Sequence, residues 1–276
     1  MNYYFKKGDC SLILLSVHDG SKKFQDCDNR HIKKISEFDS YFVDKNDINT
    51  KLITLNTYNL MKNSIKPYLL INNVHRSHVD LNRNIKKACN DKCGSCKTYY
   101  ESFHNKLEKT VNEIKKRYGK CFILDIHGNA HSKNMIQLGY NIPINDIKNN
   151  KFNELSLNSL KDTNYQEIKK HLYGTKSLSY FFNKNAYKSK IDVYPVYNNI
   201  NSEILKNKRY YHGRQYLINK YSKICDIVLL ELSPDVRFRY NTSNIISNAM
   251  VKYIANIYNN VNRGRNNNYN KMLGGK

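Results

Sequence analysis

The sequence predicts an α/β fold, a three-layer sandwich in which helices flank a mostly parallel or mixed central sheet. Two observations lead to this prediction. Short, continuous apolar runs recur along the chain, as expected for strands that are buried on both faces. Segments with apolar residues at three- and four-residue steps lie between these runs, as expected for amphipathic helices. At 276 residues, the chain is long enough for one large domain.

Four apolar runs are predicted to be strands. They span residues 12–17, 67–74, 121–126 and 226–232. In α/β sheets, the active site gathers at the carboxyl ends of the strands. The polar residues at these ends are His18, Arg76, His127 and Glu231. We therefore expect these four side chains to share one edge of the sheet.

Helical periodicity separates the predicted strands. The helices are expected at residues 47–62, 99–117, 177–187, 214–221 and 244–258. Asp47 is a candidate N-cap of the first helix because its side chain can accept hydrogen bonds from free backbone amides. We expect residues 1–260 to form a single catalytic domain. Residues 261–276 are low in complexity and predict a disordered tail.

The formal net charge of +23, from 46 basic and 23 acidic residues, would favour anionic partners. The lysines are scattered as pairs and singles, which indicates solvated surface charge, so nucleic acid is an unfavoured partner. We find no signal peptide and no run of about 20 apolar residues, as a membrane span requires. We therefore expect a cytoplasmic protein that does not cross a membrane. The oligomeric state is not indicated.

Two histidines at predicted strand ends, His18 and His127, favour a metal site. Catalytic zinc commonly has two histidines and one carboxylate as ligands, with a further position for water. Asp47 is the candidate carboxylate and Asp39 is its competitor. Each residue also has an ordinary structural interpretation, since such histidines often cap strands and such carboxylates often cap helices.

Residues 75–83 (HRSHVDLNR) place two arginines around an aspartate and an asparagine, just beyond a predicted strand. The planar guanidinium of Arg76 or Arg83 suits a bidentate grip on a carboxylate, and Asp80 could hold one of them in place. The alternative is a surface cluster of salt bridges. Glu231 lies in an apolar strand, where burial would raise its pKa towards the range that proton transfer needs. Its alternative is an edge-strand position that faces solvent.

The order of these motifs resembles the N-formylglutamate amidohydrolase family over residues 10–260. The resemblance is carried by residues 14–20, 47–50, 75–83, 100–104, 125–131, 138–140, 211–214 and 229–237. The block at 75–83 is the most specific, since it is similar to the family's Ser-Arg-x-x-x-Asp-x-Asn-Arg pattern. The resemblance implies a zinc-exopeptidase-like fold.

The resemblance also implies a role for each site residue. These roles are ligation of one zinc per chain by His18, Asp47 and His127, binding of a substrate carboxylate by Arg76, Asn82 and Arg83, and proton transfer by Glu231. The implied activity is metal-dependent hydrolysis of an amide in an N-acyl amino acid or a related small carboxylate-bearing substrate.

Departures from the family pattern leave two alternatives open. Asp19 follows His18 where the family has Gly or Ser, and Arg214 replaces the second glycine of a Gly-Gly pair. One alternative is a catalytically inactive, basic binding or structural protein with the same fold. The other is a carboxypeptidase-like peptidase, which is weakened because Ser21, and not a glutamate, stands three residues after His18.

Three cysteines, Cys89, Cys93 and Cys96, lie close in sequence. Their spacing suits a zinc knuckle or a redox pair, but a fourth ligand such as His104 would have to come from elsewhere. The other four of the seven cysteines stand alone. We therefore expect reduced thiols here, in keeping with a reducing compartment.

Overall fold

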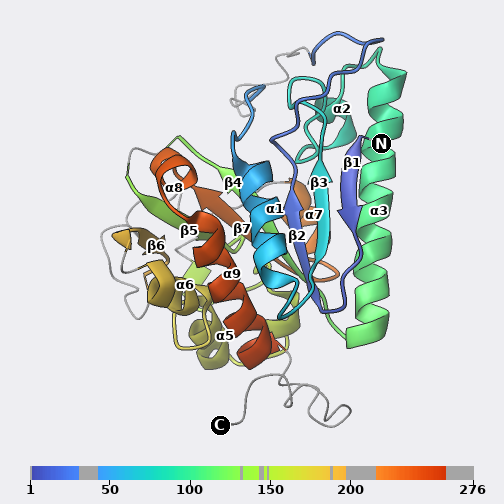
Figure 1. Cartoon of the computed structure of the whole chain (residues 1–276). Helices are drawn as coiled ribbons and strands as arrows, with labels where there is room; N and C mark the ends of the chain where they lie inside the picture. Colours follow the sequence, from blue (N-terminus) through green and yellow to red (C-terminus); the bar gives the residue numbers. More distant parts are fainter. Residues whose placement is uncertain are drawn as a thin grey trace.

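The computed structural model describes residues 2–30, 43–130, 133–142, 146–147, 149–186, 189–196 and 216–258. Over these ranges the chain forms a seven-stranded mixed sheet between two layers of helices (Figure 1). The strand order is β1-β3-β2-β4-β7-β5-β6. This architecture confirms the predicted α/β sandwich.

Four parallel strands form the centre of the sheet, and they correspond to the four predicted apolar runs. They are β3 (Tyr68–Asn72), β2 (Leu12–Ser16), β4 (Phe122–Gly128) and β7 (Asp226–Leu232). Every residue of β2 and β3 is buried. Burial on both faces explains why these strands read as continuous apolar runs, without a polar alternation.

Three further strands were not predicted from the sequence. They are β1 (Tyr3–Lys6), which pairs antiparallel with β3, β5 (Met135–Gly139), which pairs antiparallel with β7, and β6 (Asp192–Tyr194), which pairs parallel with β5. β1 is an edge strand of four residues with no fully buried residue, so it lacks the continuous aliphatic run that marks the central strands. β6, at the other edge, has three residues, which is too short for a periodic signal.

Helices cover both faces of the sheet. One face is covered by α1 (Thr50–Met61), α5 (Tyr165–Leu172), α6 (Leu178–Ala186) and α9 (Thr242–Tyr253), and the other by α3 (Gly94–Tyr118) and α7 (Tyr216–Tyr221). Alternate side chains of β2 separate the two cores: Leu12 and Leu14 pack on the first face, Ile13 and Leu15 on the second. Figure 1 shows α1 and α9 side by side over the sheet, with α3 along its other side.

The remaining short elements lie at the ends of the layers. They are α2 (Ile85–Ala88), η1 (Asn158–Leu160), α8 (Pro234–Arg239) and the π-helical turn η4 (Ile254–Tyr258). None of the described helices combines the length and apolarity that spanning a bilayer requires. The predicted tail at 261–276 lies outside the described residues, and the single catalytic domain stays a prediction.

The prediction of reduced thiols in the cysteine cluster was wrong. Disulfides join Cys27 to Cys93 and Cys89 to Cys96, with Cα–Cα distances of 5.3 and 5.8 Å. Cys27 is isolated in sequence, but residues near it pack over the start of α3: Ser95 Oγ bonds to Asp26, and Phe24 contacts the Tyr99 ring. That tertiary contact is invisible in the local spacing of the cysteines.

We expect the purified, unfolded protein to carry three free thiols among its seven cysteines. Cys10, Cys121 and Cys225 are buried in the fold and form no disulfide. Maleimide labelling in denaturant, followed by mass spectrometry, should add three labels before reduction and seven after it. Complete labelling without a reductant would contradict both disulfides.

Candidate active site

Three buried side chains, His18, Asp47 and His127, meet at the carboxyl ends of β2 and β4. The two histidine Nδ1 atoms lie 3.1 Å apart. Asp47 Oδ2 lies 3.3 Å from Nδ1 of His18 and 3.1 Å from Nδ1 of His127. The structure thus brings together the three residues that the sequence proposed as metal ligands.

The spacing of these three atoms fits a metal ion. At a Zn–N distance of about 2.0–2.1 Å, tetrahedral geometry separates neighbouring ligand atoms by about 3.3–3.4 Å. The observed separations of 3.1–3.3 Å are close to this value. Two imidazole nitrogens and a carboxylate oxygen are also a donor set that zinc accepts, and three ligands leave a position for water.

Backbone geometry brings Asp47 to the two histidines. The Asp47 amide donates to the carbonyl of His18 at 3.0 Å. The interpretation of Asp47 as an N-cap was wrong, since Asn49 takes that position with a left-handed φ of 75° and makes no side-chain cap. This turn leads the chain into α1 while the Asp47 side chain points to the imidazoles.

A second carboxylate stands behind each histidine. Asp80 Oδ1 lies 2.8 Å from Nε2 of His18, and Asp125 Oδ2 lies 2.9 Å from Nε2 of His127. The Asp80 contact is a hydrogen bond, whereas that of Asp125 is an ion-pair distance without hydrogen-bond alignment. A carboxylate at Nε2 favours the tautomer that leaves the Nδ1 lone pair for a metal.

Sequence reasoning did not find the role of Asp125. A signal was present in the Asp-x-His spacing within a predicted strand, because alternate residues of a strand face the same side. Asp80 had been expected to hold a guanidinium. It does so, through Nε of Arg76 at 3.2 Å, while it also contacts His18.

The charges of the site support one another despite burial. Burial alone would raise the pKa of Asp80, but His18 and the guanidinium groups of Arg76 and Arg30 outweigh it and hold that pKa well below its usual range. For Asp47, burial is likewise outweighed by hydrogen bonds with His127 and His18, so its pKa is also lowered. Both carboxylates are therefore anionic and suited to a cationic centre.

Arg76 is buried among the carboxylates of the site. Its Nη1 donates to Asp47 Oδ1 at 3.1 Å, and its Nε donates to Asp80. Its backbone carbonyl accepts a hydrogen bond from Arg30 Nε at 2.9 Å. The guanidinium of Arg76 thus orients a predicted metal ligand, and its contact with a substrate stays a prediction.

Asn82 and Arg83 lie at the rim of the same network. Asn82 is buried, and its Oδ1 accepts a hydrogen bond from the backbone amide of Leu217 at 2.9 Å. Arg83 is half-buried, and its carbonyl accepts a hydrogen bond from the Tyr100 hydroxyl at 2.9 Å. Helices α3 and α7 therefore fix the backbone of this segment, and the predicted substrate contacts stay predictions.

Glu231 lies beside the histidines, on the strand next to β4. It is in direct register with His127 on β4 and with Gln137 on β5. The alternative of an edge-strand glutamate was wrong, because β7 is paired on both sides. Burial raises the pKa of Glu231, and the nearby His127 opposes that rise. A carboxyl group whose pKa is raised towards the operating pH suits proton transfer.

Several residues named from the sequence lie outside the described residues. These are Asp39, the competitor of Asp47, together with His131 and residues 211–214, which include Arg214. The departure from the family pattern at Arg214 therefore has no structural description.

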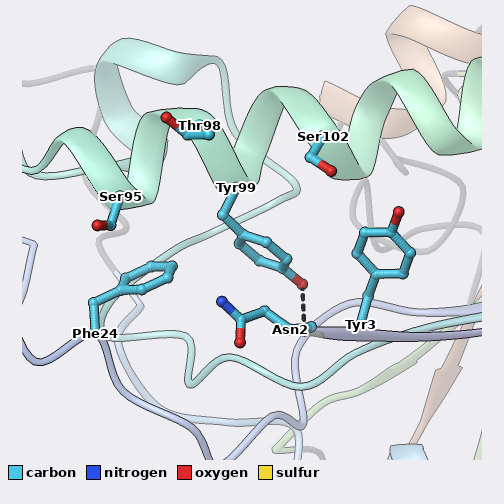
Figure 2. Close-up of a pocket in the computed structure, with 7 residues that line it drawn as sticks. All are labelled: Asn2, Tyr3, Phe24, Ser95, Thr98, Tyr99 and Ser102. Atoms are coloured by element: carbon cyan, nitrogen blue, oxygen red, sulfur yellow. Dashed lines mark hydrogen bonds between the residues drawn. The ribbon is translucent and has the colours of Figure 1, made fainter.

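A separate surface pocket of ≈ 360 Å³ contains none of the predicted site residues. Figure 2 shows it between the N-terminal strand and α3, with the rings of Tyr3, Phe24 and Tyr99 on its walls. The Tyr99 hydroxyl donates to the backbone carbonyl of Asn2 at 2.7 Å. The aromatic residues of the pocket pack in the second core, and none of its lining residues belongs to the histidine cluster.

Comparison with known proteins gives a structural relationship without a sequence relationship. No family model matches the chain, and no curated protein matches it. A crystal structure of N-formylglutamate amidohydrolase from Ralstonia eutropha JMP134 is similar, with a TM-score of 0.55 and 10% identity, covering 94% of this chain and 99% of that chain. This chain has the fold of N-formylglutamate amidohydrolase.

A crystal structure of a gene product from Agrobacterium tumefaciens is also similar. Its TM-score is 0.50 at 12% identity, and the match covers 92% of this chain and 94% of that chain. At these identities the likeness establishes the fold alone. It agrees with the α/β sandwich that the sequence predicts.

The sequence offered His104 as a candidate ligand for the cysteine cluster. In the structure, His104 instead packs against Tyr221 of the second core. It stacks on the Tyr221 ring at 6.2 Å between centroids, and its Nδ1 lies 3.2 Å from the Tyr221 hydroxyl. Burial lowers the pKa of His104 to about 3, with nearby Lys220 acting in the same direction. The imidazole is therefore neutral in the folded protein.

This neutrality predicts a loss of stability in acid. Below about pH 6.5, the pKa of an unperturbed histidine, the unfolded chain binds a proton at His104 and the folded protein does not. The free energy of unfolding therefore falls as the pH falls. Between pH 7 and pH 5, His104 should contribute a loss of about 2 kcal/mol. Urea denaturation of the wild type and His104→Gln at both pH values measures this, and an equal fall in the two proteins would contradict it.

Proposed function

We propose that this chain is a zinc-dependent amidohydrolase that cleaves the amide bond of an N-acyl amino acid or a related small carboxylate-bearing substrate. The observation that carries the proposal is the convergence of two imidazole nitrogens and the Asp47 carboxylate at the carboxyl ends of the central strands. The amidohydrolase with the same fold supports the reaction class.

The surroundings of the cluster favour a structured metal centre over an incidental group of polar residues. His18 and His127 are each 1% exposed, and their outer nitrogens face the buried carboxylates of Asp80 and Asp125. Such outer partners raise the basicity of a ligating imidazole and fix its orientation. Burying these two histidines together with the three carboxylates of Asp47, Asp80 and Asp125 costs folding free energy, which is expected where a function such as metal binding requires the groups.

Each residue around the cluster has its own proposed role in hydrolysis. His18, Asp47 and His127 would hold the zinc, which would supply a Lewis acid to polarise the amide carbonyl and acidify water. The Glu231 carboxylate, beside His127, accepts a proton from the attacking water and passes it to the leaving nitrogen. Arg83, with Asn82 and Arg76, binds the substrate carboxylate and so orients the amide.

Two alternative functions are compatible with part of these observations, and each depends on different features of the chain. A peptidase would need the same cluster but a longer substrate groove. A basic binding protein would depend on the net charge of +23 and would not need the cluster. Nucleic-acid binding with a steep salt dependence, by a protein that holds no zinc, would favour this last alternative.

We expect the purified protein to bind about one zinc per chain, because three ligand atoms converge on one point. His127→Ala should lose most of this zinc in metal analysis after dialysis. His171→Ala is the matched control, since His171 pairs with Glu167 on α5 and lies outside the cluster. Full zinc content in His127→Ala would remove the metal site.

Glu231→Gln should lower kcat by about 10²–10⁴-fold on whichever N-acyl amino acid the wild type hydrolyses, because the amide cannot accept the water proton. A release assay on a panel of such substrates measures this. Zinc content should stay unchanged, which separates proton transfer from metal loss. Glu113→Gln, at a surface ion pair with Lys7, is the control. Equal turnover in wild type and Glu231→Gln would refute the base assignment.

A further inference from the structure

Arg237 lies on α8, six residues after Glu231, and reaches two segments that carry predicted metal ligands. Its Nη1 donates to the carbonyl of Ile48 at 2.6 Å, and its Nη2 donates to the carbonyl of Asn129 at 3.0 Å. Ile48 directly follows Asp47, and Asn129 lies two residues after His127. One guanidinium group therefore joins the segment of Asp47 to the segment of His127.

The guanidinium lies directly on Gly128. A Cβ atom placed on Gly128 would stand 2.6 Å from Arg237 Cζ and 2.8 Å from its Nε. Both distances are shorter than the contacts that non-bonded Cβ atoms make in proteins. The Gly128 amide also donates to Asp47 Oδ2 at 3.2 Å. A side chain at position 128 would therefore force the guanidinium of Arg237 out of its present position.

The contact is also made from the other direction. The side-chain amide of Asn49 donates to the backbone carbonyl of Arg237. The start of α1 and the middle of α8 are therefore joined by two hydrogen bonds of opposite sense. The planar, two-pronged guanidinium can hold two carbonyls at once, whereas the single ammonium of a lysine lacks this geometry.

We propose that Arg237 is a positioning residue of the metal site, which fastens the Asp47 segment to the His127 segment, and that glycine at position 128 admits it. The inference rests on the proposed function, because it assumes that Asp47 and His127 hold a metal. It assigns a role to an arginine of segment 229–237 that the proposed reaction does not use.

A charge effect and a positioning effect have opposite signs here. A guanidinium close to a divalent cation repels it, so removal of the charge alone would tighten zinc binding. Loss of the link between the two ligand segments would weaken zinc binding, because the ligands would no longer be held at the separation that zinc needs. The direction of the change therefore decides between the two effects.

The test compares zinc dissociation constants of the wild type, Arg237→Gln and Arg239→Gln, measured by competition with a chelating dye. We expect Arg237→Gln to weaken zinc binding by about 10-fold or more, as for other outer-shell partners. Arg239→Gln removes the same charge from the same helix, where Arg239 forms an exposed pair with Asp235, and should leave the constant unchanged. Unchanged or tighter binding in Arg237→Gln would overturn the positioning role.

Two further variants test the geometry itself. Gly128→Ala should displace the guanidinium and weaken zinc binding in the wild type, but should add little in the Arg237→Gln background, because the displaced group is already gone. Additive effects of the two changes would overturn the proposal. Arg237→Lys keeps the charge without the two-pronged geometry, so full recovery of zinc affinity by lysine would overturn it as well.

Calorimetry of each metal-free protein reports whether a variant is folded. If Arg237→Gln does not fold, Arg237→Lys and Gly128→Ala carry the same comparison with the wild type. A wild type without affinity for zinc would refute the proposed function and, with it, this inference. A wild type that binds zinc as tightly as Arg237→Gln would refute the inference alone.

Discussion

The candidate site depends on the carboxylate of Asp47. One oxygen of this group lies 3.3 and 3.1 Å from the Nδ1 atoms of His18 and His127 and also accepts a hydrogen bond from the Gly128 amide, while the other oxygen accepts one from Arg76. Two imidazole nitrogens at 3.1 Å in a buried place need either a shared proton or a cation between them. The anionic carboxylate favours either solution, and the near-tetrahedral spacing of the three atoms suits a metal.

The parallel strands bring these groups together from distant parts of the chain. β2 and β4 lie side by side, so their carboxyl ends deliver His18 and His127 to one edge of the sheet. β7 adds Glu231 in register with His127. The outer carboxylates come from within β4 and from the segment after β3. The sheet thus places His18, His127 and Glu231 at strand ends, and the hydrogen-bonded network orients the side chains that the loops contribute.

The central strands and the two strand-end histidines, His18 and His127, were predictable because their signals are local. A strand buried on both faces is a continuous apolar run, and polar residues at its end are visible directly after it. Edge strand β1 has no such signal, because no residue in it is fully buried. The pairing of Cys27 with Cys93 and the link from Arg237 to Ile48 depend on contacts between segments far apart in sequence, which spacing alone does not contain.

The disulfide between Cys27 and Cys93 closes a covalent ring in which the two cysteines are 66 positions apart. The ring encloses Asp47, Arg76, Asp80 and Arg83, although His18 and His127 lie outside it. A closure of this length restricts the unfolded chain by about 4 kcal/mol in the chain-entropy description. In the oxidised protein, the segment that carries these four residues therefore stays tethered even when the chain is unfolded, and the redox conditions of the surroundings determine whether that tether exists.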